Sequence, residues 1–74
     1  MTPASSVADF LAQPIGRYYV GPRHIVFARS ATLFGHVAWG KPTADDVREM
    51  LAACAAGLDG GPRVWLVDLR ELEA

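Results

Sequence analysis

Val64-Trp65-Leu66-Val67-Asp68-Leu69 is a nearly continuous apolar run near the end of a chain of 74 residues. Such a run, bounded on its N-terminal side by turn residues, predicts a strand that is buried on both faces of a sheet. Only residues 70–74 follow it. The sheet that this strand predicts is therefore expected to be cut off halfway, and whether Ala74 is the natural C-terminus stays open.

The segment before this strand predicts a helix. Thr43 is expected as the N-cap, with Asp45 and Asp46 in the first turn, where carboxylates meet the positive end of the helix dipole. Gly57 or the run Gly60-Gly61-Pro62 is expected to end the helix. Apolar residues at helical spacing predict a stripe that lies on a sheet: Val47, Met50, Leu51, Cys54 and Leu58.

Two longer strands and one short strand are predicted before this helix. The segment 24–29 has a β-branched and aromatic centre between turn signals, and it leads almost directly into 33–39. Both faces of 33–39 are largely apolar, which predicts an interior strand of a covered sheet. Gly21-Pro22 limits the aromatic segment 18–20 to a short strand or extended stretch.

The N-terminal end predicts a separate short element. Ser6 and Asp9 resemble a capping box, so residues 1–16 are expected to form a short helix and a linker. Residues 17–74 are expected to form an α/β domain, a small mixed sheet with a β-hairpin followed by a β-α-β crossover. The predicted fold class is α/β.

Composition and charge exclude several classes of function. The formal net charge of −1 and the isoelectric point near 6.0 argue against direct binding of nucleic acid, which needs clustered positive charge. No apolar run reaches the roughly 18–20 residues of a membrane span, and no signal peptide is predicted, so a cytoplasmic location is expected. The single cysteine, Cys54, has no partner for an internal disulfide.

Two segments carry a resemblance to a known family: Gly40-Lys41-Pro42-Thr43-Ala44-Asp45-Asp46, a glycine-containing turn before a helix, and the strand 64–69 with its aspartate. The chain resembles the first half of a STAS-like domain, the fold of sulfate-transporter tails and anti-sigma-factor antagonists. The stretch from Tyr18 to Ala74 is also similar to the N-terminal sensory segment of some bacterial AraC-type transcription regulators. The phosphorylatable serine or threonine of the antagonists would lie beyond the last strand, so the resemblance implies no phosphorylation switch within this chain.

Three residues are candidates for ligand binding. Asp68 is one, because ligands of open α/β sheets usually bind at the carboxyl ends of parallel strands, although an aspartate there also commonly braces the next turn. Arg70 can hold an anion beside it or pair with a nearby carboxylate. His36 can face a pocket as a pH-sensitive or metal-binding group, or it can be packed and hydrogen-bonded. His24 is expected to be exposed, and no metal site is predicted.

The resemblance implies a non-enzymatic regulatory or sensory module of a bacterial transcription regulator, which acts through ligand or protein contacts. Its partner would be a downstream domain of the same chain or another protein, and no cofactor is expected. The alternative is a free-standing small protein that forms a homodimer to complete its core, since a chain of 8.0 kDa buries only a modest one. A small-molecule enzyme is the last hypothesis, because the sequence predicts no nucleophile or cofactor loop, and Cys54 lies in the helix stripe.

Overall fold

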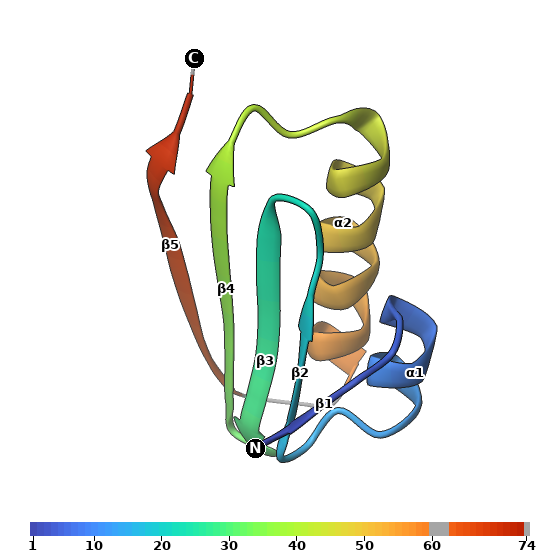
Figure 1. Ribbon diagram of the computed structural model, residues 1–74. Helices are drawn as coiled ribbons and strands as arrows, with labels where there is room; N and C mark the ends of the chain where they lie inside the picture. The colour runs from blue at the N-terminus through green and yellow to red at the C-terminus, as the bar shows by residue number, and fades with distance from the viewer. Residues whose placement is uncertain (60–62, 74) are drawn as a thin grey trace.

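The computed structural model describes residues 1–59 and 63–73 and shows a small α/β fold, in which two helices pack on a five-stranded mixed sheet (Figure 1). The predicted fold class is confirmed. The strands lie in the order β1-β2-β3-β4-β5, so each strand pairs with the next one in the chain. The elements are β1 (Thr2–Pro3), α1 (Val7–Ala12), β2 (Arg17–Val20), β3 (His24–Ser30), β4 (Leu33–Gly40), α2 (Ala44–Asp59) and β5 (Val64–Leu72).

The centre of the sheet is an antiparallel hairpin, and its outer pairs are parallel. β3 and β4 form the hairpin, with Val26 opposite His36. β5 returns parallel to β4 after α2, with Phe34 opposite Trp65. At the other edge, the two-residue β1 runs parallel to β2 and was not predicted from the sequence. The N-terminal segment therefore adds a strand to the same sheet.

Helix α1 is fastened to the sheet by its first turn. Ser6 is the N-cap, and its Oγ accepts a hydrogen bond from the backbone N of Asp9 at 3.0 Å. The Asp9 carboxylate pairs with Arg17 of β2 at 2.6 Å and accepts a hydrogen bond from the backbone N of Ser5 at 2.9 Å. These bonds, that of Arg17 first, lower the pKa of Asp9 to about 2. The fully buried Phe10 then packs into the core.

Helix α2 begins where the sequence predicts. The Thr43 Oγ1 accepts a hydrogen bond from the backbone N of Asp46 at 3.2 Å, and Asp46 Oδ2 accepts one from the backbone N of Thr43 at 2.8 Å. This reciprocal pair is a capping box with Asp in the place of Glu. The predicted N-cap is confirmed. The helix continues to Asp59 and so passes Gly57, while residues 60–62 lie outside the described residues.

The predicted apolar stripe of α2 is only partly correct. Val47 and Leu51 are 43% and 63% exposed, whereas Ala53 is buried in the core and Asp46 is buried beside it on the sheet side. The apolar pattern missed this orientation because Asp46 is buried with an ion-pair partner, Arg23, on the neighbouring loop. Within the described residues, no helix is long and apolar enough to cross a membrane.

The core lies between the two helices and one face of the sheet. β4 is an interior strand as predicted, but only its helix side is well covered: Phe34, His36 and Ala38 are buried, whereas Leu33 and Val37 on the opposite side are partly exposed. The buried apolar cluster comprises Phe10, Val26, Ala28, Phe34 and Ala53.

Strand β5 differs most from its prediction. It lies at the edge of the sheet, beyond the strands on which the helices pack, since α1 packs on β2 and α2 on β3 (Figure 1). Four of its apolar side chains are at least half exposed: Val64, Leu66, Val67 and Leu69. The predicted burial on both faces is therefore wrong. An apolar run predicts a strand, but it does not distinguish an interior strand from an edge strand whose apolar side chains are exposed.

Candidate functional site

Asp68 and Arg70, two of the three candidates from the sequence, bind each other on β5. The backbone N and Nε of Arg70 donate to Asp68 Oδ1 at 3.1 and 3.0 Å, and its Nη2 donates to Oδ2 at 2.7 Å. These hydrogen bonds hold the pKa of the Asp68 carboxyl below its usual range. The Arg70 side chain is 85% exposed. The geometry is that of a local brace on the surface, where ion pairs contribute little stability.

His36, the third candidate, lies on the other side of the sheet. It is 4% exposed, and its Nδ1 is 4.0 Å from Cys54 Sγ of α2. Desolvation by burial, with a smaller contribution from the nearby His24, lowers the pKa of His36 to about 4. Because side chains alternate along a strand, and Val37 is the residue opposite Asp68, His36 points away from Asp68. The three candidates therefore do not form one site.

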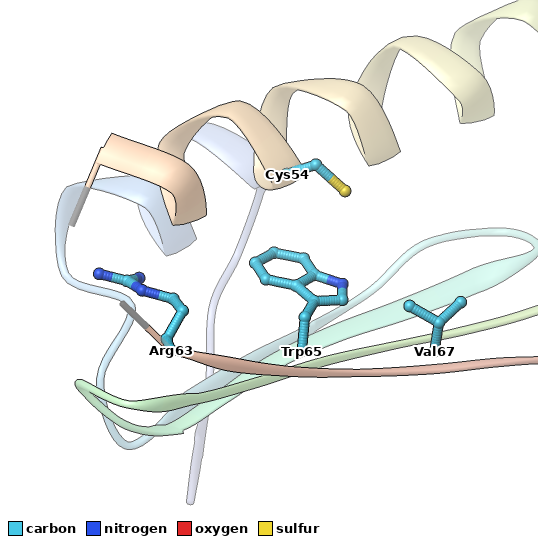
Figure 2. Close-up of a pocket in the computed structure, with 4 residues that line it drawn as sticks. All are labelled: Cys54, Arg63, Trp65 and Val67. Atoms are coloured by element: carbon cyan, nitrogen blue, oxygen red, sulfur yellow. The ribbon is translucent and has the colours of Figure 1, made fainter. Parts of the chain in front are cut away.

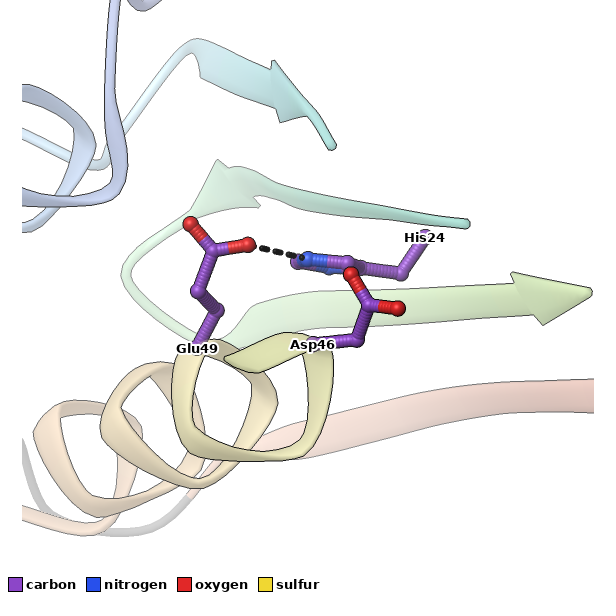
Figure 3. Close-up of side chains that lie close together, drawn as sticks. All are labelled: His24, Asp46 and Glu49. Carbon is purple, nitrogen blue, oxygen red and sulfur yellow. Dashed lines mark hydrogen bonds and ion pairs between the residues drawn. The ribbon is translucent and has the colours of Figure 1, made fainter. Parts of the chain in front are cut away.

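A polar cluster that the sequence did not reveal joins α2 to the start of β3. His24 Nε2 lies 3.0 Å from Glu49 Oε1 (Figure 3). Arg23 Nε donates to Asp46 Oδ2 at 2.5 Å. Tyr19 Oη donates a long hydrogen bond of 3.4 Å to the other Glu49 oxygen. We refer to Arg23, His24, Asp46 and Glu49 as the polar clamp, because the four residues connect the helix to the sheet.

The prediction that His24 is exposed is wrong, because α2 covers the start of β3. The His24 side chain is fully buried, and its Nδ1 has no hydrogen-bond partner among the described residues. Gly21 packs directly against the imidazole: a Cβ at this position would lie 2.6 Å from His24 Nε2. The turn before β3 therefore needs a glycine for the close approach of its backbone.

The chemistry of the clamp favours a structural role. Ligand atoms of His24, Asp46 and Glu49 lie within 4.8 Å of one another, close enough to be considered as a metal site. However, Asp46 already accepts hydrogen bonds from Arg23 and from the backbone of Thr43, so a metal cation there would compete with the guanidinium. We therefore interpret the clamp as an ion-pair link, and the prediction of no metal site stays a prediction.

One face of the sheet is uncovered within the described residues. Strand pairing places its side chains on one surface, because Val20 faces Ile25, Ile25 faces Val37, and Leu33 faces Val64. Figure 1 shows both helices on the opposite side of the sheet. We refer to this surface as the bare face; its seven apolar residues are Val20, Ile25, Phe27, Leu33, Val37, Val64 and Leu66, and the same pairing places Tyr18 and Asp68 on it.

The bare face is apolar and closely fitted. Val20, Val64 and Leu66 are 54%, 58% and 53% exposed. Phe27 lies flat across Gly35, where a Cβ would meet the Phe27 ring at 2.0 Å. Exposed apolar side chains that adjoin one another on a sheet commonly mark an interaction site, so the bare face is a candidate interaction surface.

Comparisons of this chain with protein-family models, with curated protein sequences and with solved structures each find no match. The resemblance to STAS-like domains therefore stays a prediction.

Proposed function

We propose that this chain is a non-enzymatic protein-interaction module, and that a second copy of the chain packs against its bare face. The observation that carries the proposal is the bare face itself, a sheet surface of seven apolar side chains on the side opposite the helices. Such a face resembles one half of a β-sandwich, whose core is formed by two sheets packed face to face.

A second copy suits this face because the face can meet itself. A two-fold contact places the same residues on both sides of the interface. The seven apolar residues of the bare face carry no charge, and the charge that shares the face, Asp68, lies on the edge strand β5 beside Val37. Arg70 pairs with Asp68 at 2.7 Å and neutralises this charge, so a second copy does not bring two unpaired carboxylates together.

Other features support a role without catalysis. The Cys54 thiol has a pKa raised by burial, which is the opposite of the shift that activates a nucleophile. Asp46 is used by the N-cap and by Arg23. The narrower proposal from the resemblance, a STAS-like regulatory segment, also acts through protein contacts, but it places a downstream domain on this surface instead of a second copy.

The test compares the same substitution on two surfaces. Leu66→Lys places a charge in the bare face, whereas Leu51→Lys places it on the outer side of α2, where Leu51 is 63% exposed. Burying the exposed half of Leu66 stabilises the dimer by about 1 kcal/mol per copy, so the loss is about 2 kcal/mol, or about thirtyfold in affinity, before the penalty of a buried charge.

We expect a dimer for the native chain and for Leu51→Lys in analytical ultracentrifugation, and a monomer for Leu66→Lys. Val20→Lys, on β2 and far from the β5 edge, should also give a monomer, which separates face packing from pairing along β5. A native chain that is monomeric at all concentrations would overturn the second-copy proposal. Equal effects of Leu66→Lys and Leu51→Lys would overturn the assignment to the bare face.

A further inference from the structure

A cavity of about 290 Å³ lies between α2 and β5, on the side of the sheet opposite the bare face. It is lined by Cys54 of α2, by Arg63, which directly precedes β5, and by Trp65 and Val67 on one side of β5 (Figure 2). The cavity forms because β5 extends beyond the strands that α2 covers. Its position leaves it accessible when the bare face is occupied.

The walls of the cavity are apolar and held in place. The Trp65 ring stacks on Phe34, with the ring centres 5.4 Å apart and the planes inclined by 28°. Val67 is 57% exposed and leaves one end open. Burial raises the pKa of the Cys54 thiol, so the sulfur is neutral. These three side chains offer apolar surface and an aromatic plane to a ligand.

Arg63 contributes the charge among the four lining residues. Its guanidinium carbon lies 4.3 Å from the centre of the Phe34 ring, a cation–π contact that fixes the group at the N-terminal end of the cavity. Its Nε is buried and has no hydrogen-bond partner among the described residues. Buried N–H groups are almost always paired, so this donor favours a ligand that brings an acceptor. A guanidinium is best matched by a carboxylate, which accepts two parallel hydrogen bonds.

We propose that the cavity binds a small monocarboxylic acid with an aromatic or branched aliphatic body, its carboxylate on Arg63 and its body between Trp65, Val67 and Cys54. A cavity of about 290 Å³ is at the small end of ligand pockets, which favours a small molecule. Phenylacetate, with one aromatic ring and one carboxylate, is a suitable probe. The neutral isostere phenylacetamide tests the role of the charge.

The experiment follows Trp65 fluorescence in the Trp39→Phe chain, where Trp65 is the remaining tryptophan of the two. Phenylacetate should bind and change the Trp65 emission, and phenylacetamide should bind about tenfold or more weakly, as expected for a charge-assisted hydrogen bond. Arg63→Gln should weaken phenylacetate by a similar factor and leave phenylacetamide unchanged. Arg70→Gln, which replaces an exposed arginine of β5, is the matched control and should change neither affinity.

Equal affinity for the acid and the amide, or the same affinity in native and Arg63→Gln chains, would overturn the inference. Circular dichroism verifies that Arg63→Gln is folded. If it is not, Val67→Phe fills the cavity from its exposed end and should abolish the Trp65 response, and an unchanged response would contradict the site. The outcome is independent of the proposed function, because the oligomeric state is measured on the bare face and ligand binding on the opposite side of the sheet.

Discussion

Replacing Glu49 by alanine tests whether the polar clamp holds α2 on the sheet. His24 is fully buried, its Nδ1 has no partner among the described residues, and its Nε2 depends on Glu49 Oε1 at 3.0 Å. Glu49→Ala therefore leaves a buried imidazole without this bond, a loss of about 1–3 kcal/mol. A domain of this size has a net stability of roughly 3–5 kcal/mol, so about half of it is at risk.

We expect the melting temperature of Glu49→Ala to fall by about 8–16 °C, from about 4–8 °C per kcal/mol in a small domain and a loss of about 2 kcal/mol. Glu49→Gln keeps an acceptor for His24 and should lose less than about 1 kcal/mol. Asp45→Ala removes another helix carboxylate, whose pair with Arg48 is largely exposed, and should likewise have a small effect. Thermal unfolding at a single protein concentration measures all three, since dimerisation shifts the apparent stability. If Glu49→Ala is as stable as Asp45→Ala, the clamp does not hold the helix.

Three further predictions follow from single contacts. The pKa of Asp9 is lowered from 3.8 to about 2, so its ion pair with Arg17 stabilises the fold above about pH 4, and this stabilisation is lost as the pH falls towards 2. The stability of Asp9→Asn should therefore depend less on pH over this range. A pH profile of stability that is the same as in the native chain would contradict the pairing with Arg17. Gly35→Ala places a Cβ 2.0 Å from the Phe27 ring and should lower the free energy of unfolding, measured in urea, by about 1–3 kcal/mol. The loss should be smaller in a chain that also carries Phe27→Ala. Equal losses with and without Phe27→Ala would rule out the clash. Burial lowers the pKa of His36 from 6.5 to about 4, so the folded chain holds the ring neutral and becomes less stable as the pH falls from 6.5 towards 4, where the unfolded chain binds the proton more readily. An NMR titration of the ring should show a midpoint near 4, and a midpoint near 6.5 would refute its burial.

Local signals in the sequence predicted the parts of the fold that depend on neighbouring residues. Thr43 and Asp46 form the cap of α2, and Ser6 forms that of α1, because a capping hydrogen bond spans only three residues. The hairpin of β3 and β4 was also predicted correctly, since a short turn between two β-rich runs leaves few other arrangements.

Local sequence signals could not predict the position of β5 in the sheet or the contacts of the polar clamp. Burial of β5 depends on which strands the helices cover. The apolar run 64–69 would look the same in the sequence whether it formed an edge strand or an interior strand. The clamp joins His24 and Glu49, which are 25 residues apart. One signal was present: Asp46 and Glu49 are three residues apart, which places two carboxylates on the same side of a helix. The sequence does not show which strand this side of the helix packs against, so it did not identify Arg23 and His24 as the partners of the two carboxylates.

Sedimentation equilibrium of the native chain over a range of concentrations tests the central claim most directly. The claim is that the bare face is the functional surface and that a second copy covers it. We predict a mass that rises with concentration to twice the 8.0 kDa of the chain, and a Leu66→Lys variant that stays at 8.0 kDa under the same conditions. A native chain that stays at 8.0 kDa throughout would contradict the claim.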